Sequence, residues 1–150
     1  MEQTILTQTN FTKLKEEVKK SKDKTIIFSS EDDDLNRKVM EKLPVQIILI
    51  SQSNRKDFQK QRNSGFNQVM AKAAKKSNIA IGINLDEIIE ERDLKKKSDL
   101  FARVKQNIML CNKNKVKMKF TNQKDKNKRN NHDLKSLGSV LGMPTNMLIN

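Results

Sequence analysis

VQIILI (residues 45–50) and IAIGI (residues 79–83) are short apolar runs, and an amphipathic segment, residues 65–76, lies between them. Apolar runs of this length without alternation are typical of strands buried on both faces of a parallel sheet. Apolar residues recur at helical spacing in the segment between them. The polar stretch at residues 51–64 is long for a strand-to-helix loop, and compact domains seldom hold so many loop residues without a use. The whole unit therefore predicts a strand, a long loop, a helix and a second strand.

The same alternation extends along the rest of the chain. Further strands are expected at residues 4–7, 25–28 and 116–120, and further helices at residues 11–20, 30–43, 85–89, 100–111 and 133–142. Asn10 and Asp133 are placed to cap the first and last of these helices. The pattern predicts a single α/β domain over residues 1–150, with about five parallel strands covered by helices. A doubly wound sheet and a partial (β/α) barrel both satisfy it, because periodicity alone does not separate the two.

Positive charge is the main compositional feature of this chain. Its 150 residues carry a net charge of +13, with 33% charged and 35% hydrophobic residues. Residues 103–135 hold eleven Lys or Arg and two Asp, which gives +9 within about a fifth of the chain. Such a balance favours a polyanionic partner, although a Lys-rich solvated surface is the alternative. The absence of Trp and Tyr limits base stacking on aromatic rings.

The residues that enzymes use for chemistry are scarce. His132 is the one histidine, so no histidine-based metal cluster can form, and it borders a polar, basic stretch at residues 121–131 that is expected to be mobile. Asp32, Asp33 and Asp34 are interpreted as the acidic start of a helix rather than as a cation site. Cys111 lies in an apolar run and is interpreted as a buried hydrophobe. The sequence therefore disfavours catalysis by its own side chains, and no catalytic residue, metal ligand or bound cofactor is assigned.

The N-terminus and the hydropathy pattern bear on location. Residues 1–4 lack the basic and apolar regions of a signal peptide, and no stretch has the roughly 20 apolar residues of a membrane span. A cytoplasmic protein without membrane contact is expected.

Basic side chains follow two of the predicted strands. In parallel β/α folds the loops after the strands line one edge of the sheet, so these groups are expected to share a rim that can lie along a phosphate backbone. Arg forms two parallel hydrogen bonds with phosphate where Lys cannot, so Arg55, Arg62 and Arg129 carry the most weight. The residues expected to bind nucleic acid are Arg55, Lys56, Arg62, Lys72, Arg103, Lys124, Lys128 and Arg129.

Two ordered groups of residues carry a family resemblance. The first is Asn54-Arg55-Lys56-Asp57 followed by Gly65-Phe66-Asn67, Val69, Ala71-Lys72 and the run at 79–82. The second is Asp133-Leu134 through Leu137-Gly138 and Leu141-Gly142. In order and spacing these segments resemble the RNase P protein component 3 family, the barrel-type protein subunit of archaeal and eukaryotic ribonuclease P.

The resemblance implies a TIM-like barrel related to the polymerase-and-histidinol-phosphatase barrels but without their metal ligands. It implies a subunit that supports the catalytic RNA in removing the 5′ leader of precursor tRNA, with Mg held by that RNA. The implied partners are RNase P RNA, precursor tRNA, RNase P protein component 2 and the other subunits. The candidate basic residues are then RNA-binding residues. Which nucleotides they contact, whether the domain needs its partner to fold, and its oligomeric state stay open.

The chain departs from the family pattern in three ways. It lacks one or two initial β/α units and the final helix, its loop between Asp57 and Gly65 is expanded, and an Asn/Lys-rich stretch precedes the last helix. An incomplete barrel has unpaired strand edges, so residues 4–7 or 116–120 are expected to form an edge. The alternative functions are a degenerate hydrolase-like α/β domain and a protein-interaction module, each with an incidental basic surface.

Overall fold

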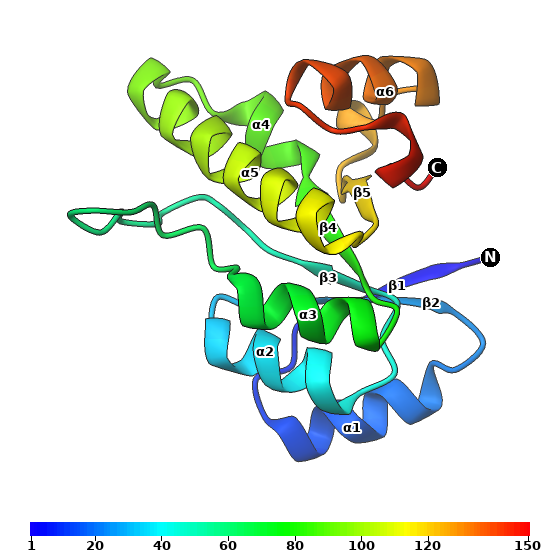
Figure 1. Cartoon of the computed structure of the whole chain (residues 1–150). Helices are drawn as coiled ribbons and strands as arrows, with labels where there is room; N and C mark the ends of the chain where they lie inside the picture. Colours follow the sequence, from blue (N-terminus) through cyan, green and yellow to red (C-terminus); the bar gives the residue numbers. More distant parts are fainter.

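A computed structural model describes all 150 residues as alternating strands and helices around one sheet (Figure 1). The strands are β1 Gln3–Leu6, β2 Thr25–Ser29, β3 Ile47–Leu49, β4 Ala80–Asn84 and β5 Met118–Thr121. The α-helices are α1 Phe11–Lys20, α2 Asp33–Lys42, α3 Gln68–Lys76, α4 Leu85–Glu90, α5 Leu94–Asn114 and α6 Asn131–Val140. Two short 3-10 helices are η1 Asp125–Asn127 and η2 Thr145–Met147. The predicted order of strands and helices is confirmed.

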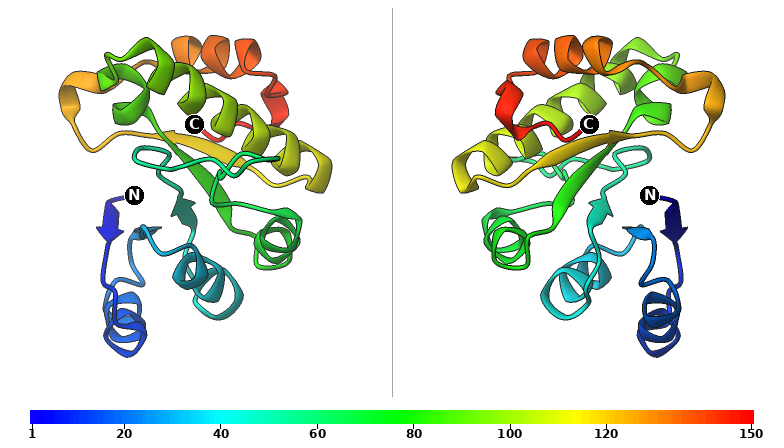
Figure 2. Two further views of the ribbon diagram at one scale, coloured as in Figure 1. Left: turned by 90° about the vertical axis from the view of Figure 1, so that its left-hand side faces the viewer. Right: turned by 90° about the vertical axis from the view of Figure 1, so that its right-hand side faces the viewer.

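The order of the strands in space settles the architecture. All neighbouring strands are parallel and follow the order β1-β2-β3-β4-β5. A doubly wound sheet reverses direction at a switch point, so that alternative is wrong. Successive right-handed crossovers in one direction place the helices on one face and curl the sheet. Figure 2 shows the curved sheet with the helices around its convex side, an open part of a barrel.

The core lies mainly between the sheet and its helices. A cluster of 30 buried apolar residues fills this layer, from Leu14 and Val18 of α1 to Ile108 and Cys111 of α5. A second cluster, Ile27, Ile47, Leu49 and Ala80, lies on the concave face. Register explains the second cluster, because Ile27, Ile47 and Ala80 are direct cross-strand partners. Apolar residues on both faces account for the uninterrupted runs in the sequence.

The two ends of the sheet are both edges, as predicted. β1 has no strand on its outer side, whereas β5 is partly covered by the C-terminal segment. Met118 forms an isolated parallel bridge with Leu148, and the Ile149 amide donates to the Met118 carbonyl at 2.8 Å. The chain thereby covers part of the β5 edge with its own backbone.

Two details of the expected helices need correction. Asn10 caps α1 as predicted, but Asp133 does not cap α6, since Asn130 accepts the Asp133 amide and Asp133 lies inside the first turn. The long helix begins at Leu94 rather than near residue 100, because Asp93 caps it through the Lys96 amide. Both shifts arise from capping side chains just upstream of the apolar pattern.

Candidate nucleic-acid interface

The long loop between β3 and α3, residues 50–67, is held to α2 by Arg55. The Arg55 guanidinium forms two parallel hydrogen bonds with the Asp33 carboxylate, Nη1 to Oδ2 and Nη2 to Oδ1, each at 2.9 Å. Its Nε donates to the Ser51 carbonyl at 2.7 Å. The side chain is 10% exposed, so its donors are used within the protein. Arg55 therefore positions the loop.

Gly65 completes this arrangement. Its φ of +72° lies in the left-handed region that favours glycine. A Cβ atom at this position would lie 2.7 Å from Arg55 Cζ and 2.9 Å from Nη1. The guanidinium cannot move aside easily, because its bonds to Asp33 and Ser51 hold it in place. Arg55 and Gly65 of the sequence motif therefore pack directly against each other.

Asp57 and Arg103 hold the same loop to α5. Arg103 Nε donates to Asp57 Oδ1 at 2.9 Å, and Nη2 donates to the Arg55 carbonyl at 2.9 Å. Burial opposes ionisation of Asp57, but hydrogen bonds from Arg103 and the Asn63 amide, with the charges of Arg103 and Arg62, outweigh it and lower its pKa. The Arg103 side chain is 8% exposed. Arg103 is consequently an internal support of the loop.

Buried amides tie the start of the loop to its end. Gln52 and Asn107 both donate to the Ser64 carbonyl, at 2.9 and 3.3 Å. The Glu87 carboxylate of α4 accepts the backbone amides of Gln52 and Ser53. These contacts give residues 50–67 a defined path across the ends of the strands.

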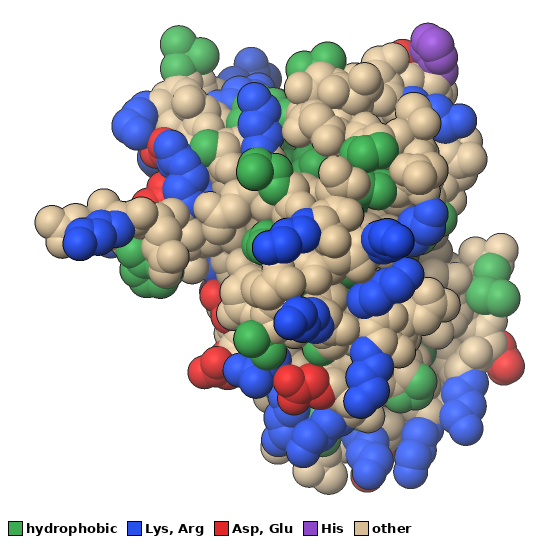
Figure 3. Space-filling view, in the orientation of Figure 1, with side chains coloured by type: hydrophobic (Ala, Val, Ile, Leu, Met, Phe, Trp, Pro, Cys, Tyr) green, Lys and Arg blue, Asp and Glu red, His purple; other side chains and the backbone are tan.

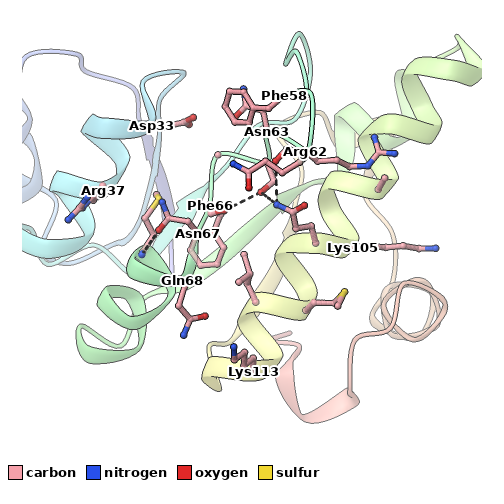
Figure 4. Close-up of a pocket in the computed structure, with 18 of the residues that line it drawn as sticks. Asp33, Arg37, Phe58, Arg62, Asn63, Phe66, Asn67, Gln68, Lys105 and Lys113 are labelled. Carbon is pink, nitrogen blue, oxygen red and sulfur yellow. Dashed lines mark hydrogen bonds between the residues drawn. The ribbon is translucent and has the colours of Figure 1, made fainter.

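A groove of about 1160 Å³ lies between α2, this loop and α5 (Figure 4). Five basic side chains line it: Arg37, Lys60, Arg62, Lys105 and Lys113. Two acidic residues, Asp33 and Asp34, lie at its α2 side. Phe58 is 57% exposed and lines the groove beside these cations. A groove with excess positive charge and one exposed aromatic ring suits a single-stranded nucleic acid.

The segment after β5, residues 122–130, is held in place by contacts with α4. Asn127 is buried, and its Nδ2 donates to Asp86 Oδ1 at 2.7 Å. Lys124 and Lys126 both pair with Glu90, at 2.6 and 3.2 Å. Hydrogen bonds from these two lysines lower the pKa of Glu90 to about 2. The predicted mobility of this stretch stays a prediction, but α4 anchors its centre.

The structure divides the predicted basic residues into three groups. Arg55 and Arg103 are engaged internally, as described above. Arg62 and Lys124 are exposed but paired, Arg62 with Asp57 and Asp99 at 3.0 and 3.3 Å and Lys124 with Glu90. The exposed residues without an ion pair are Lys56, Lys72, Lys128 and Arg129.

The sequence predicted one shared rim, but its basic residues lie on two loops with α4 between them. Loop 50–67 follows β3, and segment 122–130 follows β5, so both leave the carboxyl ends of strands. Figure 1 shows the first loop projecting well away from α6, which begins two residues after Arg129. The carboxylates of α4 separate the two basic groups. The strongest local arrangement of cations is therefore the groove, not a continuous rim.

The sequence analysis did not select Arg37, Lys60, Lys105 and Lys113 for this interface. One signal was available, since Lys105, Met109 and Lys113 recur every four residues and share a helix face. Nothing in the sequence indicated that α2 would lie across from this face.

Few residues are arranged for other chemistry. No group of three or more His, Cys, Asp or Glu side chains lies together in a way that could hold a metal ion. Burial raises the pKa of the Cys111 thiol to about 12, as expected for a packed hydrophobe. No helix combines the length and apolar character needed to cross a membrane.

Comparison with solved structures shows a related fold. The chain is similar to a chain in the "cryo-EM structure of archaeal Ribonuclease P with mature tRNA", with a TM-score of 0.79 and 21% sequence identity. The likeness covers 97% of this chain and 62% of that one, so this chain spans less than two thirds of its length. No family model and no curated protein matches the chain. At this identity the likeness establishes the fold.

Proposed function

We propose that this chain is a protein subunit of ribonuclease P, of the component 3 type, that binds and supports the catalytic RNA. The likeness to a chain of archaeal ribonuclease P over 97% of the present chain carries the proposal. The motif Asn54 to Asp57 with Gly65 to Asn67 supports it, because these residues build the loop that walls the basic groove. The net charge of +13 supports a polyanionic partner.

In this function the chain performs no bond cleavage. The catalytic RNA, with its Mg ions, removes the 5′ leader of precursor tRNA, and the protein supplies a rigid basic surface. Component 2, further subunits and precursor tRNA are the proposed partners, and the cytoplasm is the proposed location. Within the chain, ionised lysines along the groove replace counterions of the RNA backbone.

The proposed RNA contacts are the basic side chains that keep exposed surface, whether or not they also form an ion pair. Arg55 and Arg103 affect RNA binding only indirectly, because they hold loop 50–67 in its conformation. The direct contacts are Lys56, Arg62, Lys72, Lys124, Lys128 and Arg129, together with the groove residues Arg37, Lys60, Lys105 and Lys113. Lys124 and Arg62 keep part of their surface open, at 53% and 42% side-chain exposure. Phe58 offers one base a stacking surface.

Binding to RNase P RNA tests the proposal. The wild-type chain is expected to bind this RNA more tightly than an unrelated folded RNA of equal length. A variant that carries Lys60→Gln, Lys105→Gln and Lys113→Gln should bind about tenfold more weakly, because three phosphate contacts are lost. Equal affinity of the wild-type chain for RNase P RNA and for the unrelated RNA would overturn the proposal in favour of an incidental basic surface.

A matched control uses three lysines outside the groove. Lys15→Gln, Lys20→Gln and Lys22→Gln remove the same charge from and just beyond α1, where all three side chains are exposed and form no ion pair. This control should bind RNase P RNA like the wild type. Equal weakening in both triple variants would indicate that only total charge matters.

A further inference from the structure

A second hollow lies at the opposite end of the sheet from loop 50–67. It has a volume of about 430 Å³ and is lined by the first residues of four strands or their immediate neighbours, among them Thr25, Gln46, Ala80 and Lys117. The groove described above lies beyond the carboxyl ends of the strands. The two sites are thus separated by the length of the strands, which is roughly 10 to 17 Å for three to five residues.

Four lysines line this hollow: Lys75, Lys115, Lys117 and Lys119. No Asp or Glu side chain lines it, and none of the four lysines forms an ion pair. One intramolecular contact exists, since Lys117 Nζ donates to the Asn146 carbonyl. The four lysine side chains therefore have no carboxylate partner.

The backbone brings these lysines together from two helices and a strand. α3 and α5 both end at this side of the sheet, and each end is followed by a residue in the left-handed region, Asn78 at φ +55° and Lys115 at φ +57°. These turns lead directly into β4 and β5. Lys75 comes from the last turn of α3, whereas Lys117 and Lys119 flank Met118 at the start of β5.

Helix stabilisation explains only part of the cluster. A lysine in the last turn interacts favourably with the carbonyl end of a helix, which accounts for Lys75. Lys119 lies in a strand and is half-buried, so that reason does not apply to it. Figure 3 shows that blue side chains predominate over α3 and the end of α5, with little red among them. Among the other exposed cations, Arg62, Lys124 and Lys126 have carboxylate partners, whereas Lys56, Lys72, Lys128 and Arg129 have none.

We propose that the lysine cluster of Lys75, Lys115, Lys117 and Lys119 is a second RNA-backbone site, separate from the groove. The choice of RNA as the polyanion rests on the proposed function. Unpaired ammonium groups around a hollow bind consecutive phosphates and release their counterions, without reading base sequence. With the groove at one end of the sheet and this cluster at the other, a single chain contacts two segments of a folded RNA.

A fully paired RNA hairpin serves as the probe, because the cluster reads only phosphates. The variant that carries Lys75→Gln, Lys115→Gln and Lys119→Gln is expected to bind it about tenfold more weakly than wild type, with a salt slope lower by about 3. The α1 control, Lys15→Gln, Lys20→Gln and Lys22→Gln, should keep the wild-type slope. Thermal melting of each variant checks that the fold is intact.

The outcomes separate this site from the proposed function. If the wild type does not bind the hairpin at low salt, or if the cluster variant and the α1 control behave alike, the second site is refuted. If the cluster variant loses hairpin binding but wild type shows no preference for RNase P RNA, the site stands and the proposed function fails. If wild type prefers RNase P RNA but the cluster variant binds the hairpin normally, the second site is refuted and the proposed function stands.

Discussion

At the scale of single residues, the motif around Arg55 and Gly65 acts on the loop rather than on a ligand. Arg55, one of the three arginines that sequence reasoning weighted above the lysines for RNA, is bonded to Asp33, 22 residues away. Because four of the five N–H donors of Arg55 are used inside the protein, its replacement should change stability before it changes binding chemistry.

Gly65→Ala is expected to destabilise the protein more than Gly142→Ala. Both positions have positive φ, at +72° and +90°, which costs a non-glycine residue about 1 to 2 kcal/mol. A Cβ atom at Gly65 meets the Arg55 guanidinium, whereas at Gly142 nothing lies within 4 Å. Denaturant unfolding of the two variants gives the difference.

A double-mutant cycle isolates the contact. In an Arg55→Ala background the Gly65→Ala change meets no guanidinium, so its added cost should fall to that of Gly142→Ala. An unchanged cost would show that backbone strain alone governs Gly65.

Cys111 is expected to be inert in the folded protein. Burial raises its pKa to about 12, so almost no thiolate is present at neutral pH. A colorimetric thiol titration should show no reaction in buffer and one thiol per chain after denaturation. Rapid reaction of the native protein would indicate that α5 opens readily.

At the scale of elements, two ion pairs and α4 hold the long loops in place. The Arg55–Asp33 pair joins loop 50–67 to α2, and the Asp57–Arg103 pair joins it to α5. The carboxylates of α4 contact both loop 50–67 and segment 122–130. These contacts determine the positions of the exposed lysines on loop 50–67 and on segment 122–130.

Arg103→Met should destabilise the protein by about 2 kcal/mol, because the Asp57 carboxylate and two loop carbonyls lose the donor of the hydrogen bonds that they accept. Lys95→Met removes a comparison pair, with Asp99, in which the lysine is 82% exposed. That variant should change stability by at most about 0.5 kcal/mol. Similar losses in the two variants, measured by chemical denaturation, would contradict the assigned role of Arg103.

Acid should loosen the segment after β5. Glu90 has a pKa of about 2 in the folded chain against 4.5 for the free group, since Lys124 and Lys126 hold its charge. A depressed folded pKa contributes stability above pH 4.5, and this contribution is lost as the pH falls towards 2. Glu90→Gln should therefore flatten the dependence of melting temperature on pH in that window. An unchanged slope would mean that the pairs are not populated in solution.

At the scale of the whole molecule, an open barrel must manage two strand edges. The outer edge of β1 has no partner strand, and the C-terminal segment covers part of the β5 edge through Leu148 and Ile149. Exposed edges favour association with other chains.

Deletion of residues 145–150 should increase association. It removes the backbone bond to Met118 and uncovers the apolar surface under Met147, which is 5% exposed. Light scattering across a concentration series should show larger species than for wild type, while deletion of Asn150 alone should have no effect. Identical scattering for both deletions would show that the segment does not protect the edge.

The sequence by itself determined the alternation of five strands with helices, the Asn10 cap and the buried Cys111. These features depend on neighbours within a few residues, and helical and strand periods record them directly. The tertiary structure alone decided between a doubly wound sheet and an open barrel, through the strand order. It alone also showed that Arg55 and Arg103 are paired and that the lysines at the opposite end are free. Ion pairs such as Arg103 with Asp57 join residues 46 positions apart, so they exist only once folding has brought those elements together.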